Sequence, residues 1–403
     1  MRQTSDSTIS QAARKGVSGG NNNVGESSAT DYSTANSLQR RQQRDGAKLA
    51  EPESRLESGS SNSILLTYRE ISQHHAWFFP CLIILAHFAV FFMTDEKSDV
   101  HQMLAKMMTV SYHIEGTDQY GKGEYDFYFV GFYSLCFTFL REFMMVCIFR
   151  PAALYFGIRK ETKIKRFMEQ TYSMFYYGML GPFGLWVMSR TPLWLFETTP
   201  FYLEYPHTTH DIYFKVYYLG QAAFWVQQSV VLLLQLEKPR KDFHELIAHH
   251  IVTIALIWNS YAFHFTWMGL AVYVTMDVSD FFLSFSKTLN YLGSPLAGPF
   301  FVIFVGVWIY LRHWINLKII WSVMTEFLTV GECTLNNATQ LYKFWFSQPI
   351  VLGLLVALQL LNLYWLFLIC RILYRYAVGG VAADERSDEE SDGETTVDAK
   401  KEE

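Results

Sequence analysis

Residues 249–285 read "HHIVTIALIWNSYAFHFTWMGLAVYVTMDVSDFFLSF" and belong to two apolar runs, 248 to 264 and 266 to 288. The runs meet at Phe265 and Thr266, with almost nothing between them. Apolar runs of this length predict helices that cross a membrane. The stretch therefore predicts a tight hairpin of two transmembrane helices.

The whole chain has the composition of a membrane protein. Of its 403 residues, 50% are hydrophobic and only 18% are charged, which leaves little polar material to coat a soluble globule. Apolar runs near the length of a span predict about eight transmembrane helices, at 76–94, 127–149, 172–189, 213–235, 248–264, 266–288, 299–324 and 349–371. We therefore predict an all-α, polytopic membrane protein.

The distribution of basic residues predicts how the chain is oriented. Lys and Arg mark cytosolic loops, and they cluster after the second, fourth and last runs, at Arg150, Arg159, Lys160, Lys163, Lys165, Arg166, Lys238, Arg240, Lys241, Arg371 and Arg375. The segment from Asp95 to Asp126 is net acidic by contrast. Both termini are therefore predicted to be cytosolic, and the possible glycosylation sequon at Asn337 is predicted to be lumenal.

The two ends of the chain differ from this membrane core. The region 1–72 begins with a long segment rich in Ser, Asn, Gln and Arg, which cannot bury enough apolar surface to fold. It has no apolar signal-peptide core, so the first span is expected to be the insertion signal. The tail 381–403 is strongly acidic, and Ser387 and Ser391 precede acidic residues, which makes them candidate phosphorylation sites. No charge pattern suggests a nucleic-acid partner.

The segment "HELIAHH" at 244–250 raises the question of a metal site. A zinc-protease helix needs the pattern HExxH, but Ala248 stands where the second histidine belongs, and His249 lies about 140° round the helix from His244. A membrane di-iron hydroxylase needs several converging histidine boxes, and the one other adjacent pair, at 74–75, precedes the first run. Di-iron chemistry is therefore a minor alternative, and no metal is expected.

The hairpin itself suggests partners for the histidines. A residue about 15 positions before the turn lies level with one about 15 after it, which pairs His249 and His250 with Asp280 and places Asp277 one turn deeper. Ionisable groups inside a membrane are costly unless they are paired, and a carboxylate fixes the tautomer of an imidazole and raises its basicity. Such a cluster suits general-base or nucleophilic catalysis on a lipid substrate. A proton-coupled lipid transporter or a lipid sensor would use the same groups.

The segment from Lys238 to Leu292, with "KDFHELIAHHIVT" and "VTMDVSDFFLSFSKTLNYL", resembles the longevity-assurance motif of ceramide synthases, the fungal members in particular. Matching stretches, "GPFGLWVM" at 181–188, "YLGQAAFWVQQ" at 218–228 and "NLYWLFLICRILYR" at 362–375, extend the resemblance from Tyr120 to Arg375. Composition and this resemblance together predict four regions: a disordered cytosolic region (1–72), the first two transmembrane helices with a lumenal loop (73–160), a catalytic TLC domain (161–380) and an acidic cytosolic tail (381–403).

The resemblance also implies an activity. Ceramide synthases transfer a long or very-long fatty acyl chain from acyl-CoA to the amine of a sphingoid base, dihydrosphingosine or phytosphingosine, in the endoplasmic reticulum. The family's catalytic residues match His249, His250, Asp277 and Asp280. An imidazole would deprotonate the amine, and either direct attack on the thioester or an acyl-imidazole on His249 is compatible with these residues. Asn259 and Tyr273 are candidate donors to the carbonyl oxyanion.

Acyl-CoA is expected as a co-substrate, with no bound cofactor. Its phosphates would meet cytosolic cations, for which Lys238, Arg240, Lys241 and Arg312 are the candidates. By resemblance, the loop at 325–347 would govern acyl-chain length, and the chain would work as a homomer or as a heteromer with a paralogue and a small single-span accessory subunit.

Overall fold

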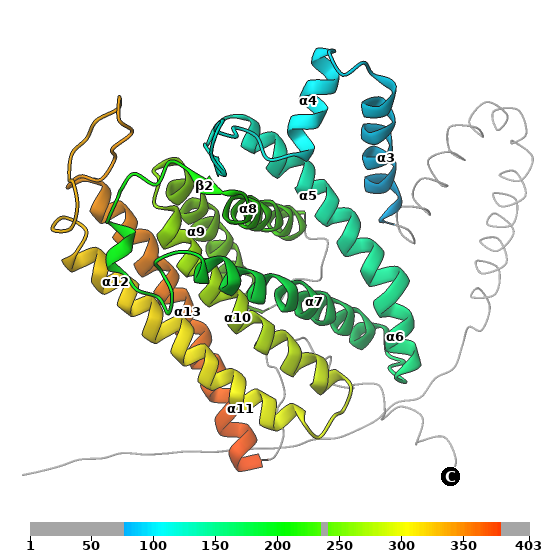
Figure 1. Cartoon of the computed structure of the whole chain (residues 1–403). Coiled ribbons are helices and arrows are strands. Elements are labelled where there is room, and N and C mark those ends of the chain that lie inside the picture. Colours follow the sequence, from blue (N-terminus) through cyan, green and yellow to red (C-terminus); the bar gives the residue numbers. More distant parts are fainter. Residues whose placement is uncertain (1–75, 235–240, 380–403) are drawn as a thin grey trace, which may run out of the picture. The chain divides into compact units, whose positions relative to one another are not determined.

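The structure, a computed structural model, describes residues 76–234 and 241–379 (Figure 1). Within these ranges it consists of helices and two short strands that pair antiparallel. In chain order the elements are α3 (Phe78–Met93), α4 (Asp99–Met108), β1 (Gln119–Tyr120), α5 (Tyr125–Phe143), the π-helical η1 (Met144–Phe149), α6 (Arg150–Tyr155), α7 (Glu161–Ser189), the 3-10 turn η2 (Thr199–Phe201), β2 (His210–Asp211), α8 (Ile212–Leu233), α9 (Phe243–Ala262), α10 (Thr266–Tyr291), α11 (Ala297–Trp308), the π-helical η3 (Ile309–Ile315), α12 (Asn316–Thr325) and α13 (Ser347–Gly379). The terminal regions predicted at 1–72 and 381–403 lie outside the described residues, as do Lys238, Arg240, Ser387 and Ser391.

A helix covers each predicted apolar run, although α7 begins well before its run at 172–189 and α4 was not predicted. In the part of the chain described, four helical stretches are long and apolar enough to cross a membrane: Tyr125–Tyr155, Thr266–Tyr291, Ala297–Thr325 and Ser347–Val378. The chain is therefore a multi-pass membrane protein. Helices α7, α8 and α9 have 29, 22 and 20 residues, so their composition and not their length keeps them out of this group. The predicted domain division at residue 160 stays a prediction.

The predicted hairpin is confirmed. Helix α9 ends at Ala262, and α10 begins at Thr266 after a turn in which His264 has a φ of 62°. Helix α10 also packs along α7 and α11. Its close approach to α7 depends on small residues, since a Cβ on Gly178 would lie 3.2 Å from the Phe281 ring. Helix α10 is therefore surrounded by neighbours, and it is a suitable place for buried polar groups.

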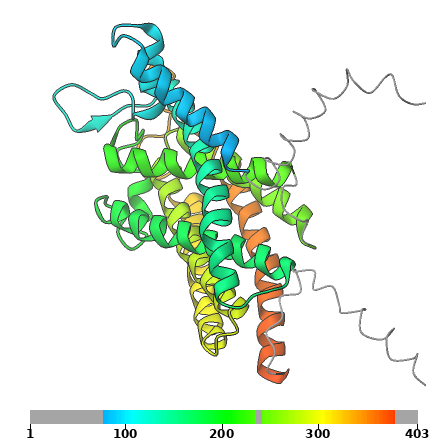
Figure 2. The same cartoon turned by 90° about the vertical axis from the view of Figure 1, so that its right-hand side faces the viewer.

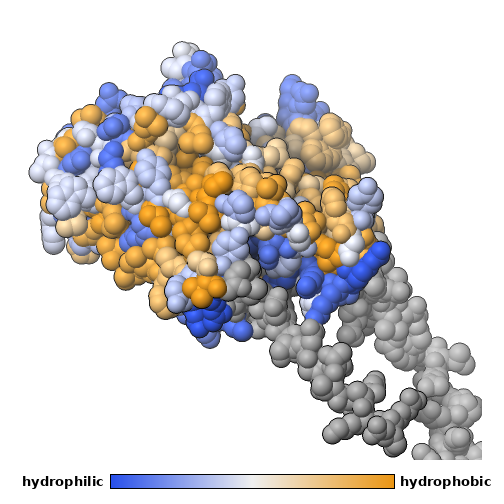
Figure 3. Space-filling view, turned by 90° about the horizontal axis from the view of Figure 1, so that it is seen from below, coloured by the Kyte–Doolittle hydropathy of each residue, from blue (hydrophilic) through white to orange (hydrophobic). Residues whose placement is uncertain are grey.

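The outer surface of the described part is apolar. Large hydrophobic side chains face outwards from many helices, with exposed fractions of 66% for Ile251, 68% for Trp314 and 66% for Phe367. Hydrophobic residues cover much of the face seen in Figure 3, and Figure 2 shows α13 alongside α11 and α12, which also contact it. Such a surface would be unfavourable in water, but it is the expected one where lipid chains replace the solvent.

The helix bundle has two distinct ends. At one end α6 meets α7, α9 begins, α10 meets α11 and α13 finishes; we call it the basic end because it carries the exposed residues Arg159, Lys160, Lys163, Lys241, Arg371 and Arg375. The opposite end, which we call the loop end, holds the connections 94–124, 190–211, 263–265 and 326–346. The polar site described next lies between these two ends.

Candidate active site

The histidine pair of α9 is held by the neighbouring helix α8 and by α13. His249 is 6% exposed, and its ring packs edge-on against Trp225 at 5.6 Å and against Trp365 at 5.2 Å between centroids. His250 Nδ1 lies 3.1 Å from Ser229 Oγ, and its ring also contacts Trp225. Two indole rings therefore fix the orientation of His249 without using its ring nitrogens.

The two aspartates of α10 are bound by other partners than the histidines. Asp280 Oδ1 lies 2.5 Å from Arg312 Nη2. Asp277 is fully buried, and its Oδ2 accepts hydrogen bonds from Tyr217 Oη at 2.8 Å and from the Gln221 side-chain amide. Tyr217 and Gln221 lie one turn apart on α8, so this helix holds both the deeper carboxylate and the indole against the histidines.

The predicted hydrogen bonds between imidazoles and carboxylates are therefore wrong. The three residues do line one cavity: His249, His250 and Asp280 all contribute to it. However, the rotation of α10 turns Asp280 towards Arg312, which the sequence analysis named only as a candidate contact for the CoA phosphates. Nδ1 of His249 is buried, and no group in the described part of the chain is its hydrogen-bond partner.

Arg312 is positioned by a distortion in its own helix. It belongs to η3, a π-helical segment between α11 and α12. Its guanidinium donates to Ser279 Oγ at 2.6 Å and to Asn362 Oδ1 at 3.3 Å, and it stacks over Trp308 at 4.1 Å. A π-bulge shifts the register of a helix by a residue and often occurs at functional sites. Here it brings Arg312 into the site from one helix while Asp280 enters from another.

Two cavities meet at His249. The larger, about 350 Å³, has an almost wholly apolar lining and extends from α9 and α10 to Leu335, Tyr342 and Phe346 at the loop end. The smaller, about 210 Å³, is more polar and lies towards the basic end, where Asp242 and Lys287 join its lining. Trp225 and His249 line both cavities. A molecule with an apolar tail and a polar head would therefore place the junction between them at His249.

The remaining predicted site residues divide into two groups. Asn259 and Tyr273 line the larger cavity, and the buried hydroxyl of Tyr273 has no described hydrogen-bond partner. The amide of Asn259 instead donates to the carbonyl of Ala255 at 2.7 Å. Lys241 is exposed at the start of α9 and lines neither cavity, while Lys238 and Arg240 lie outside the described residues. Asn337 is exposed at the loop end.

Sequence reasoning missed five residues of the site: Trp225, Trp365, Tyr217, Gln221 and Asp242. The signal for the α8 residues was present, because Tyr217, Gln221 and Trp225 repeat every four residues and so share one helix face. Nothing in the sequence identified the partner of that face. As for metals, residues 76–234 and 241–379 contain no group of three His, Cys, Asp or Glu side chains placed to hold an ion.

Comparison with known proteins gives a consistent result. The family model of TRAM, LAG1 and CLN8 proteins, described as the TLC domain, matches residues 166–371. Ceramide synthase LAG1 of Saccharomyces cerevisiae (strain ATCC 204508 / S288c) is 54% identical over 329 residues, which cover 82% of this chain and 80% of that protein. Sphingosine N-acyltransferase lac1 of Schizosaccharomyces pombe is 51% identical over 285 residues, which cover 70% of this chain and 74% of that protein.

Proposed function

The chain belongs to the family of fungal ceramide synthases, sphingosine N-acyltransferases with a TLC domain, and we propose that it transfers an acyl chain from acyl-CoA to a sphingoid base at His249. The observation that carries the assignment of the site is the position of His249 at the junction of an apolar and a polar cavity. The acyl tail would fill the larger cavity, which places the thioester carbon beside the imidazole.

The chemistry follows from this position. A sphingoid base is protonated near neutral pH, so its nitrogen must lose a proton before it attacks a thioester carbonyl. His249 is the group placed to accept that proton, or to carry the acyl chain as an acyl-imidazole. The unpartnered hydroxyl of Tyr273 supports it as the oxyanion donor, with Asn259 as the alternative. Ser229 holds His250 in place. This histidine and the two aspartates would keep the site polar and its helices in position.

We propose that the eight predicted spans, including the shorter α3, cross the membrane of the endoplasmic reticulum, with the basic end and both termini in the cytosol. The exposed lysines and arginines of that end support this orientation. CoA would then approach from the cytosol, where Lys241 and the neighbouring Lys238 and Arg240 would attract its phosphates. Arg312 is a weaker candidate, since Asp280 already neutralises it.

The loop end would then be lumenal, which makes the exposed Asn337 an accessible glycosylation acceptor. Leu335, Tyr342 and Phe346 in the 325–347 loop contribute to the far wall of the larger cavity, which supports a role for this loop in acyl-chain selection. Phosphorylation of Ser387 and Ser391, and assembly with a second copy, a paralogue or a small single-span subunit, are further proposals.

The experiment that tests the catalytic assignment is amide formation by membranes that carry the wild type or His249→Ala. Each receives a long-chain base and a very-long-chain acyl-CoA, and the ceramide and CoA formed are quantified by mass spectrometry. Loss of the proton acceptor should lower turnover by about 10²- to 10⁴-fold. His244→Ala, an exposed histidine on the same helix, is the control and should retain full activity. A His249→Ala protein that still forms ceramide at the wild-type rate would move the chemistry elsewhere.

A further inference from the structure

Asp242 has a carboxylate that its own helix does not use. It directly precedes α9, where an aspartate usually accepts hydrogen bonds from the first helical N–H groups, but its backbone, with φ −95° and ψ 32°, lies outside the extended region and no such bond forms. The residue is 3% exposed and lines the smaller cavity. Its Oδ2 accepts a hydrogen bond from Trp365 Nε1 at 3.0 Å, whereas Oδ1 is buried and has no hydrogen-bond partner among the described residues. One carboxylate oxygen is therefore available to a ligand.

Asp242 shares its cavity with Arg312 and Lys287, but no described residue is its ion-pair partner. The second carboxylate in the same cavity, Asp280, is neutralised by Arg312 at 2.5 Å. Asp242 forms no ion pair with any residue in the described part of the chain; its contact is the neutral indole of Trp365. A carboxylate removed from water without a counter-charge is unfavourable, and a cationic ligand in the cavity would relieve that cost.

The walls beside Asp242 suit an alkylammonium group. Trp225 and Trp365 both line the cavity, and aromatic rings attract ammonium groups through their quadrupole. Trp365 also links Asp242 to the reacting residue, because its N–H binds the carboxylate while its ring lies 5.2 Å from that of His249. A cation at Asp242 would therefore be separated from His249 by one indole ring.

We propose that the smaller cavity is the docking site for the ammonium group of the sphingoid base, with Asp242 as its counter-charge and Trp365 as the side chain that positions this carboxylate beside His249. The proposal rests on acyl transfer at His249. Asp242 would bind the base alone, because a carboxylate does not attract the negatively charged phosphates of CoA. The base would arrive protonated at Asp242 and give its proton to His249 as its nitrogen moves towards the thioester carbon.

The test is Asp242→Asn, which keeps the shape and an oxygen acceptor for Trp365 Nε1 but removes the charge. The KM values for the base and for acyl-CoA are measured separately, together with the Ki of an N,N-dimethylated long-chain base, which is cationic and has no N–H to acylate. The KM for the base and the Ki should both rise about 10- to 100-fold, the range for a lost hydrogen bond to a charged group. The KM for acyl-CoA should not change. Glu245→Gln, one turn further along α9 and outside the cavity, should leave all three constants unchanged.

A second variant distinguishes a loss of base binding from misfolding of Asp242→Asn. Trp365→Phe keeps Asp242 and an aromatic wall but removes the indole donor, so it should raise the same two constants by a smaller factor. If Asp242→Asn raises both KM values in parallel, or if neither variant changes the Ki, the proposal is overturned. The wild type still forms ceramide in either case, so this failure is distinct from a failure of the proposed function.

Discussion

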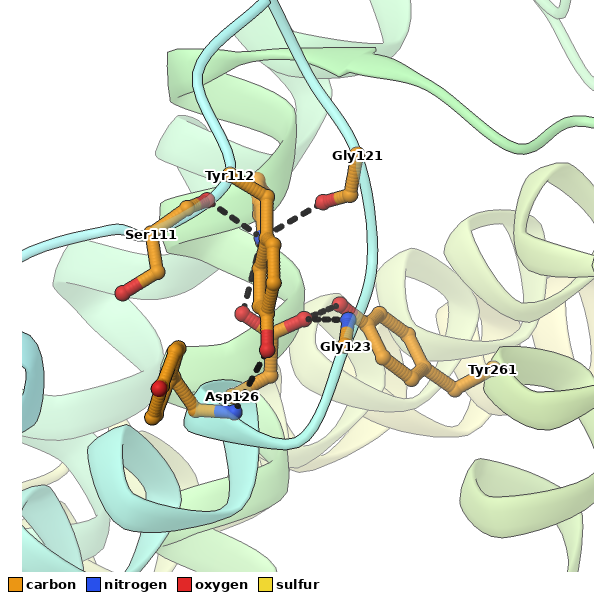
Figure 4. A network of polar contacts seen from close by, with 8 residues as sticks. Ser111, Tyr112, Gly121, Gly123, Asp126 and Tyr261 are labelled. Carbon is orange, nitrogen blue, oxygen red and sulfur yellow. Dashed lines mark hydrogen bonds and ion pairs between the residues drawn. The ribbon is translucent and has the colours of Figure 1, made fainter.

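Two buried carboxylate–cation pairs lie in different parts of this protein, and their surroundings differ. At the loop end Asp126 Oδ1 lies 2.7 Å from Lys215 Nζ, which also donates to the carbonyls of Ser111 at 2.9 Å and Gly121 at 2.6 Å. The second oxygen of Asp126 accepts from Gly123 N–H at 3.0 Å and from Tyr261 Oη at 2.6 Å (Figure 4). The network ties α5, α8 and α9 to the 111–123 loop, and neither charged residue lines either of the two cavities.

The second pair, Asp280 and Arg312, borders the smaller cavity, and the polar atoms around it are incompletely paired. His249 Nδ1 and Asp242 Oδ1 belong to residues that line this cavity, and both atoms are buried without hydrogen-bond partners in the described part of the chain. A completed network stabilises the fold, whereas buried polar atoms left open beside a cavity are available to a substrate. A buried charge alone therefore does not identify a functional site; the unpaired groups and the cavity next to it do.

The largest expected effect is on the completed network. Lys215→Met leaves Asp126 buried without its cation, which should cost about 3–5 kcal/mol of stability. The thermal midpoint in detergent should fall and less folded protein should be recovered, while turnover per folded molecule stays at the wild-type value. If turnover per folded molecule falls as steeply as the midpoint, the loop-end pair also takes part in the reaction and the contrast between the two regions fails.

The next effect concerns the larger cavity. Leu354→Trp places a bulky ring in its lining, so the enzyme should lose about 10- to 100-fold in kcat/KM with very-long acyl-CoAs relative to shorter ones, in proportion to the methylene groups excluded. Competition between two acyl-CoAs of different length measures this ratio. Val356→Trp, on the outer face of the same helix and 38% exposed, is the matched control and should leave the ratio unchanged. An unchanged ratio in Leu354→Trp would remove the acyl tail from this cavity.

The most gradual effect is a pH dependence of stability at the loop end, because it is spread over several pH units. Burial lowers the pKa of Lys122 to about 7, although Asp126 opposes the shift. Burial likewise lowers the pKa of His264 and of His207 to about 4, further depressed by the charge of Lys122. Because these pKa values are 10.5 and 6.5 in the unfolded chain, the folded protein binds fewer protons in the intervals 7 to 10.5 and 4 to 6.5. Stability should therefore rise with pH across both intervals.

For one proton the slope is at most about 1.4 kcal/mol per pH unit. Thermal midpoints recorded on either side of pH 7 measure it. Lys122→Met should abolish the rise above pH 7 while keeping the rise at lower pH, and Lys163→Met, which replaces an exposed lysine at the basic end, should keep both. A midpoint that falls with pH above 7 in the wild type would contradict a neutral Lys122.

The sequence predicted the parts of this molecule that depend on a single helix. Apolar runs located the helices, and counting from the turn at Phe265 correctly placed His249 and His250 near Asp280. The partners of these residues were not predictable, because they depend on how each helix is rotated about its axis. Tyr217 and Gln221, which bind Asp277, come from α8, and the π-helical turn that delivers Arg312 to Asp280 has no signature in the sequence.

The measurement that tests the account most directly is turnover per folded molecule in His249→Ala and Lys215→Met, compared side by side. Folded protein is quantified by fluorescence-detected size-exclusion chromatography, and ceramide by mass spectrometry. The account predicts that His249→Ala is well folded and almost inactive, whereas Lys215→Met is poorly recovered but fully active per folded molecule. Ceramide formation at the wild-type rate by folded His249→Ala, or an equal loss of turnover in both variants, would contradict it.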